Sequence, residues 1–116
     1  MVKMKVLITG GTGFLGKSLT RYLHRLGYEV FSVGSKNWDL RNQNFCDTLI
    51  SQVSPDVIIH AAGSVGGIGA NQENPGKFMY ENMIMGANMI DSSRVNKIDK
   101  FILLGTVCAY PKYTPV

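Results

Sequence analysis

The feature that most constrains the fold is a glycine-rich loop between a short apolar run and a helical pattern. Residues 5–9 (KVLIT) are apolar and β-branched, which is typical of a buried strand. Glycines follow at positions 10, 13 and 16, and apolar residues then recur with helical spacing from Phe14 to Leu26. Gly27 stands where many helices end. The start of the chain therefore predicts a strand, a tight loop and a helix.

The remainder continues this alternation. Further strands are predicted at residues 28–33, 57–60 and 101–104, and helices at 43–52 and from Pro75 to Val95, with a long glycine-rich loop over 63–75. The β-α-β-α-β-α-β order predicts an α/β fold of Rossmann type, a doubly wound parallel sheet with helices on both faces. Right-handed crossovers then give an expected strand order of 3-2-1-4. Both glycine-rich loops would follow carboxyl ends of strands, where such sheets bind ligands.

Composition narrows the class of protein. The 116 residues are 45% hydrophobic and 17% charged, which suits one compact unit and excludes a disordered chain. The net charge of +4 comes from dispersed Lys and Arg residues, so no nucleic-acid-binding surface is expected. No apolar run approaches the ~18 residues that span a membrane. The apolar stretch at the start of the chain is also too short for a secretory signal. Cys46 and Cys108 suggest neither a disulfide framework nor a metal site, so we expect a cytoplasmic protein without metal.

The glycine loop fits two phosphate-binding motifs. Gly10, Gly13 and Gly16 form G-x-x-G-x-x-G, a dinucleotide-binding variant, while residues 11–18 also match the G-x-x-x-x-G-K-S loop of P-loop NTPases. The apolar stripe begins at Phe14, so the helix is predicted to start before Lys17, as dinucleotide binding requires. No predicted strand ends in the Asp that a P-loop protein uses for magnesium. We therefore favour a dinucleotide.

The end of the second predicted strand indicates which dinucleotide. Gly34-Ser35-Lys36 follows it, and the carboxylate that holds the ribose 2′-hydroxyl in NAD-binding proteins is missing there. NADP(H) is therefore favoured, because Ser35 and Lys36 could meet its 2′-phosphate. The alternative is that Lys36 is an ordinary solvent-exposed lysine. Asp39-Leu40 would flank the adenine, and Asn82 would order the neighbouring loop through backbone hydrogen bonds. His60 is expected to be a packed residue with one hydrogen bond. The predicted cofactor-binding residues are Gly10, Thr12, Gly13, Phe14, Leu15, Gly16, Ser35, Lys36, Asp39, Leu40, Ala61, Ala62, Gly63 and Asn82.

Several stretches carry a family resemblance. They are the T-G-G-T-G-F-L-G loop, Ala61-Ala62, V-G-G-I at 65–68, Y-E-N-M at 80–83 and L-G-T-V-C-A-Y-P-K at 104–112. With these the chain resembles the extended short-chain dehydrogenase/reductases, and within them the GDP-L-fucose synthase family. The resemblance covers all 116 residues. It implies NADPH-dependent epimerisation at C3 and C5 of GDP-4-keto-6-deoxy-D-mannose and reduction of its C4 ketone to give GDP-L-fucose.

The resemblance also implies site residues and a partner. Thr106 would hydrogen-bond the C4 oxygen of the sugar, and Cys108 would act as acid or base in epimerisation. Taken by itself, Cys108 is better explained as a small buried residue, and only the resemblance makes the catalytic role equally plausible. Val65, Gly66 and Gly67 would contact the GDP-sugar, and the helix Pro75–Val95 would form a homodimer. Threonine at 106, valine at 107 and Gly63-Ser64 depart from the family pattern, which leaves other nucleotide sugars open.

One expected element is missing. None of the tyrosines begins the Tyr-x-x-x-Lys pair that this family uses for hydride chemistry. We therefore expect residues 1–116 to be the N-terminal part of an NADP-binding Rossmann domain, with the rest of the fold and the substrate domain outside this chain, and to be inactive alone. The alternatives are another nucleotide-sugar epimerase or dehydratase, and a non-catalytic NADP-binding module.

Overall fold

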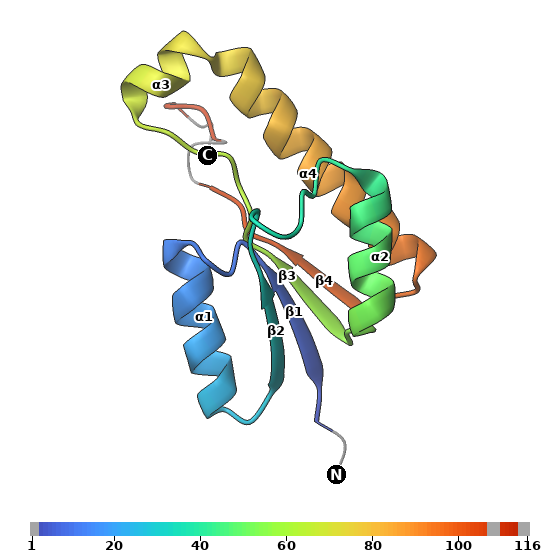
Figure 1. The fold of residues 1–116 in the computed structure, drawn as a ribbon. Coiled ribbons are helices and arrows are strands. Elements are labelled where there is room, and N and C mark those ends of the chain that lie inside the picture. The colour runs from blue at the N-terminus through green and yellow to red at the C-terminus, as the bar shows by residue number, and fades with distance from the viewer. Residues whose placement is uncertain (1–2, 107–109, 114–116) are drawn as a thin grey trace.

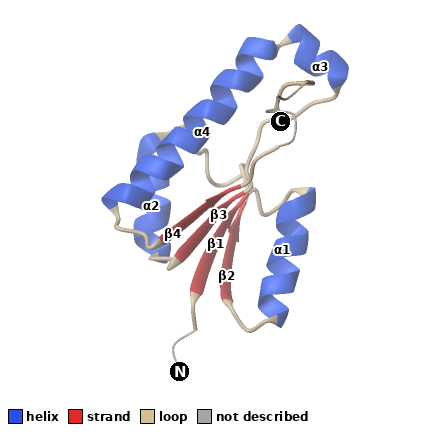
Figure 2. Ribbon diagram, turned by 180° about the vertical axis from the view of Figure 1, so that it is seen from behind, coloured by secondary structure: helices blue, strands red, loops and turns tan. Residues whose placement is uncertain are grey.

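A computed structural model describes residues 3–106 and 110–113. It contains a parallel sheet of four strands, β1 (Lys5–Thr9), β2 (Glu29–Val33), β3 (Val57–His60) and β4 (Lys100–Leu103). The helices are α1 (Phe14–Arg25), α2 (Gln43–Val53), α3 (Ile68–Glu73) and α4 (Pro75–Val95). Helix α1 lies on one face of the sheet, whereas α2 and α4 lie on the other (Figures 1 and 2). The predicted Rossmann-type α/β fold is confirmed.

The predicted strand order is wrong. The observed order is β2-β1-β3-β4, so β1 pairs with β2 on one side and with β3 on the other. Burial explains the difference, because Ile58 and His60 of β3 are buried while Glu29 and Ser32 of β2 are exposed. A strand with exposed polar residues suits a sheet edge, and one whose residues are mostly apolar and buried suits the centre. The connection through α2 therefore carries the chain past β1 before β3 is added.

The core lies between the sheet and the pair α2 and α4. Side chains from both sides of this layer are almost fully buried, and they include Leu7 and Ile58 of the sheet, Cys46, Leu49 and Ile50 of α2, and Met89 of α4. Gly16 is the buried residue of α1, and Leu15, Tyr22 and Leu26 stay exposed although they belong to its apolar stripe.

The helix α3 was not predicted, because its residues fall inside the expected loop over 63–75. Six residues that include Gly69 give it no clear helical periodicity. The Asn71 amide donates hydrogen bonds to the carbonyl oxygens of Gly66 and Gly67 at 2.9 and 3.0 Å, and these contacts hold the turn in place. In the described part of the chain, no helix combines the length and apolar character needed to cross a membrane.

Candidate functional site

The glycine loop joins β1 to α1 at the carboxyl edge of the sheet. Gly10 adopts φ +68°, and a Cβ there would lie 2.6 Å from the backbone of Ala61. A Cβ on Gly16 would lie 2.0 Å from the Gly10 carbonyl oxygen. Helix α1 begins at Phe14, three residues before Lys17, and its N-cap Gly13 offers no side chain to the first turn. Its leading N–H groups therefore remain available to an anion, in the arrangement that dinucleotide binding predicts.

A cavity of about 600 Å³ opens beside this loop. Its walls come from the glycine loop, the segment after β2, the segment after β3 and one side of α4. The predicted residues on these walls are Gly10, Thr12, Gly13, Phe14, Leu15, Gly16, Ser35, Asp39, Leu40, Ala61, Ala62, Gly63 and Val65. The topology thus brings together four segments that are far apart in the sequence.

Other predicted residues do not line this cavity. Lys36 is exposed and lies off the cavity wall, whereas Ser35 lies on it. Gly66 packs toward Ala70 and Phe78, where an added Cβ would lie 2.8 and 3.1 Å away. Gly66 and Gly67 are therefore built into the turn that starts α3. Cofactor contact by Lys36 and sugar contact by these two glycines stay predictions.

The predicted site residues did not include several residues of the cavity wall, namely Val33, Gly34, Trp38, Arg41, Ser64, Glu81 and Met85. Gly34 faces the glycine loop closely, since a Cβ on it would lie 2.7 Å from the Thr12 side chain. Arg41 directly follows Asp39-Leu40, and Glu81 precedes Asn82, so each adjoins a residue that was predicted. This adjacency is the signal in the sequence that could have identified Arg41 and Glu81 as residues of the cavity wall.

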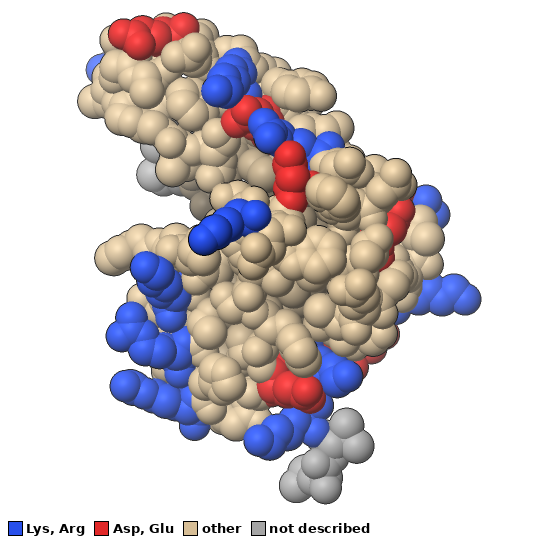
Figure 3. All heavy atoms as spheres, viewed as in Figure 1, with Lys and Arg blue, Asp and Glu red and all other residues tan. Residues whose placement is uncertain are grey.

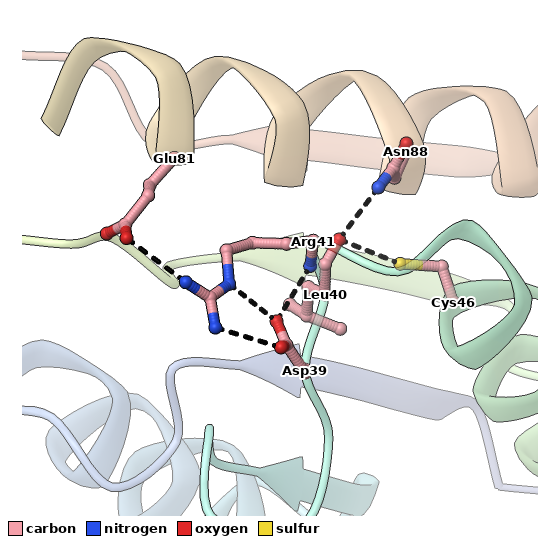
Figure 4. A network of polar contacts seen from close by, with 6 residues as sticks. All are labelled: Asp39, Leu40, Arg41, Cys46, Glu81 and Asn88. Carbon is pink, nitrogen blue, oxygen red and sulfur yellow. Dashed lines mark hydrogen bonds and ion pairs between the residues drawn. The ribbon is translucent and has the colours of Figure 1, made fainter. Parts of the chain in front are cut away.

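Arg41 forms the main charged cluster of the cavity wall (Figure 4). Its Nε and Nη2 atoms contact both carboxylate oxygens of Asp39 at 2.9 and 3.0 Å, and its Nη1 contacts Oε1 of Glu81 at 3.1 Å. These hydrogen bonds lower the pKa of Asp39 and raise that of Arg41. A hydrogen bond from Ser64 is the largest cause that lowers the pKa of Glu81, with the Lys77 and Arg41 charges adding to it. All three side chains are therefore charged near neutral pH.

The segment after β3 is tied to α4. The Ser64 N–H donates to Oδ1 of Asn82 at 2.7 Å, and Nδ2 of Asn82 donates to the Ser64 carbonyl oxygen at 3.0 Å. The expectation that Asn82 orders this loop is confirmed. Asn82 itself is not on the cavity wall, so it acts on the cavity through Ser64, and its direct contact with a cofactor stays a prediction.

A buried pair lies beneath the cavity. The Thr9 hydroxyl is 2.7 Å from Nδ1 of His60 and accepts the Ala62 N–H at 3.3 Å. The His60 ring also stacks on Phe101, with ring centroids 6.2 Å apart. Burial lowers the pKa of His60, so the ring is neutral at pH 7 and can accept the hydroxyl proton. His60 is a packed, hydrogen-bonded residue as expected, and it fixes the floor formed by Ala61 and Ala62.

The predicted catalytic residues, Thr106 and Cys108, follow β4 in the sequence. Thr106 is exposed and follows that strand at the same sheet edge as the cavity, although it does not line the cavity. Cys108 lies outside the described residues, and so does Val107. Within the described ranges, no cluster of three or more His, Cys, Asp or Glu side chains could hold a metal ion.

The surface around this edge is hollowed. Figure 3 shows a notch between the α1 part of the molecule and the part that carries α3 and α4. Lys and Arg side chains gather on the α1 side, where Lys17, Arg21 and Arg25 follow one another at intervals of four residues. Their positive potential favours the approach of an anionic ligand.

Comparison with known proteins agrees with this geometry. Residues 6–116 match the family described as "NAD dependent epimerase/dehydratase family". The chain is 43% identical over 109 residues to GDP-L-colitose synthase of Yersinia pseudotuberculosis. This match covers 94% of this chain and 35% of that protein. It is 40% identical over 107 residues to GDP-L-fucose synthase of Azorhizobium caulinodans, covering 92% and 34%. The chain thus spans about a third of the length of these curated relatives.

A solved structure gives the same result. The GDP-L-fucose synthetase from Naegleria fowleri, bound to NADP, superposes with a TM-score of 0.83 at 27% identity, over 97% of this chain and 34% of that one. The match extends over the strands, the glycine loop and the helices described above. On its fold, its glycine loop and the match over residues 6–116, the chain belongs to the NAD dependent epimerase/dehydratase family.

Proposed function

We propose that this chain is the N-terminal, NADP(H)-binding part of a nucleotide-sugar epimerase/reductase that converts GDP-4-keto-6-deoxy-D-mannose to GDP-L-fucose. The observation that carries the proposal is the cavity at the carboxyl ends of β1, β2 and β3, with the glycine loop as one wall. The names of the relatives support the reaction, and their greater length supports the assignment of the chain to one part of a longer enzyme.

The residues present fit a dinucleotide phosphate. A Cβ on Gly10 or Gly16 would overlap neighbouring backbone atoms, so the tight loop needs glycine at both positions, and the first turn of α1 has no side-chain cap. The N–H groups of this turn would hold the pyrophosphate. Thr12 and Ser35, which carry hydroxyl groups, line the cavity, and Asp39, the first carboxylate after β2, is paired with Arg41. This favours a ribose 2′-phosphate over a free 2′-hydroxyl.

In the proposed reaction, bound NADPH supplies the hydride that reduces the C4 ketone. The Thr106 hydroxyl would hydrogen-bond the C4 oxygen and so stabilise the negative charge that develops there. Cys108 would take and return protons at C3 and C5, which the adjacent ketone acidifies. The Tyr-x-x-x-Lys pair would come from chain beyond these residues. We place the reaction in the cytoplasm, where a reduced thiol persists.

The activity is tested with the full-length protein, GDP-4-keto-6-deoxy-D-mannose and NADPH. We expect NADPH oxidation and GDP-L-fucose as product, and a Cys108→Ser variant that has lost epimerisation but still binds NADPH. A protein that binds NADPH and leaves it unoxidised with this substrate contradicts the proposal. A second candidate is the synthesis of GDP-L-colitose, favoured by the 43% identity to the Yersinia enzyme. Colitose lacks the 3-hydroxyl group, so a parallel assay with the 3-deoxy form of the keto-sugar substrate separates the two.

The cofactor preference can be measured on this chain alone. Trp38 is its single tryptophan and lines the cavity, so energy transfer from Trp38 to a reduced nicotinamide reports binding. We expect NADPH to bind more tightly than NADH. Tighter binding of NADH would show that the hydroxyl groups of Thr12 and Ser35 do not select the 2′-phosphate.

We also propose a homodimer through α4. Met79, Tyr80 and Met83 are each more than 60% exposed on this helix, while Met89 on another side is fully buried. An exposed apolar stripe beside a packed one suits a protein interface. In sedimentation experiments we expect a dimer that Met83→Glu converts to monomer, and a monomeric parent protein would contradict this.

A further inference from the structure

One part of the cavity wall, the segment 39–41, lies in the irregular stretch between β2 and α2. Its backbone forms local hydrogen bonds, since the Arg41 N–H donates to the Asp39 carboxylate and the Asn42 N–H to the Asp39 carbonyl oxygen, both at 3.1 Å. These bonds shape a turn. They do not place that turn relative to the rest of the cavity wall.

The carbonyl oxygen of Leu40 connects this turn to two helices. It accepts a hydrogen bond from Nδ2 of Asn88 on α4 at 3.0 Å and one from Sγ of Cys46 on α2 at 3.3 Å. Figure 4 shows both side chains pointing at this oxygen. Leu40 and Asn88 are buried, at 4% and 6% exposed. Because a thiol is a weak donor, the Asn88 amide makes the stronger of the two contacts.

A second contact from α4 reaches the same segment but contributes less. Glu81 lies two turns before Asn88 on one face of the helix, and its Oε1 accepts from Nη1 of Arg41 at 3.1 Å. The Arg41 side chain is 50% exposed, and ion pairs of that kind add little. Loss of the Asn88 donor would instead take a strong partner from a buried carbonyl group, which is costly. The buried contact therefore decides where the segment lies.

We infer that Asn88 is a positioning residue for the dinucleotide: its amide holds the Leu40 carbonyl oxygen and so fixes the segment 39–41 against the adenosine half of the ligand. The inference rests on the proposed function. Asn88 itself does not line the cavity, whereas Leu40 does. Its effect on a ligand thus passes through the backbone of Leu40.

The test compares Asn88→Leu and Asn88→Ala with the parent protein. Dissociation constants for NADPH are measured by Trp38 energy transfer, and those for 2′,5′-ADP, which carries only the adenosine half, by displacement of NADPH. Both variants lack the donor, and leucine fills the space that alanine leaves empty. We expect each variant to weaken both ligands by the same factor, roughly 3- to 10-fold, the equivalent of one net hydrogen bond.

Ser92→Ala is the matched control for lost stability. Ser92 is also buried on α4, and its hydroxyl accepts from Nε2 of Gln43 at 2.6 Å and donates to Oδ1 of Asp47 at 2.5 Å. Both partners belong to α2 and lie off the cavity wall. We expect the urea midpoint to fall in this variant as well, with NADPH binding unchanged. All titrations are run where unfolding curves show each protein to be folded, because a loss of stability alone does not change affinity there.

Four outcomes overturn the inference. They are unchanged NADPH binding in Asn88→Leu, a loss in Asn88→Ala that leucine restores, a loss for NADPH without one for 2′,5′-ADP, and an equal loss in Ser92→Ala. The second would show that the side chain acts by filling space, and the last that affinity follows the general packing of α2 on α4.

A second measurement needs no ligand. Hydrogen exchange at the amides of Arg41 and Asn42 should quicken in Asn88→Leu and stay unchanged in Ser92→Ala, and equal exchange in both overturns the inference. If the parent protein binds neither NADPH nor 2′,5′-ADP, the proposed function fails, while the exchange difference still decides whether Asn88 holds this segment.

Discussion

Replacing Gly16 by alanine is the sharpest test of the glycine loop. The new Cβ would lie 2.0 Å from the Gly10 carbonyl oxygen, 2.7 Å from Cα of Gly11 and 2.8 Å from the Gly10 carbonyl carbon. Ordinary contacts begin near 3.4 Å, so the loop must move by more than about 1 Å. Because every obstacle is a backbone atom, no change of side-chain rotamer can relieve the overlap.

Two opposing terms set the size of the effect. Alanine gains about 1 kcal/mol over glycine within a helix. Overpacking in a closely packed interior costs about 1–3 kcal/mol, and more where backbone must shift. We expect a net loss of about 1–2 kcal/mol of unfolding free energy. Dinucleotide affinity should fall at least roughly tenfold, the equivalent of one hydrogen bond to a charged phosphate.

The assays are urea unfolding followed by Trp38 fluorescence and an NADPH titration. Gly86→Ala is the matched control, because the same substitution in the middle of α4 meets no atom within 4 Å. It should stabilise the protein by about 0.5–1 kcal/mol and leave binding unchanged. A Gly16→Ala variant that binds NADPH as tightly as the parent protein would refute the argument that this close approach builds the phosphate cradle.

Two further predictions concern buried titratable groups. Burial lowers the pKa of His60 below its usual 6.5, so its contribution is fully present above pH 6.5 and is lost as the pH falls through the folded-state pKa. His60→Asn keeps an acceptor for Thr9 but does not titrate, and its urea midpoint should change less between pH 7.5 and pH 5.5 than that of the parent; an equal change would contradict the assignment. Burial raises the pKa of Cys46 to about 11, so in a Cys108→Ser background we expect alkylation at pH 8 only after unfolding. Equal labelling rates in native and unfolded protein would show that this thiol is accessible.

Local patterns in the sequence predicted the elements well. The strand Lys5–Thr9, the helix start before Lys17 and the helix Pro75–Val95 all follow from periodicity, glycine and proline. These signals work because a helix or strand depends on residues within a few positions of one another. The short helix α3 lacked such a signal, since it depends on the hydrogen bonds of Asn71 to Gly66 and Gly67.

The sequence by itself determined that this protein has a glycine loop between a buried strand and a helix, and hence a phosphate-binding edge in an α/β fold. Only the tertiary structure decided that β3 lies beside β1, that Lys36 lies off the cavity wall and that Arg41 reaches Glu81, forty positions away. The physical reason is one of range. A turn or a helix is stabilised by neighbours in the chain, whereas strand order and a cavity wall depend on which distant surfaces bury each other best.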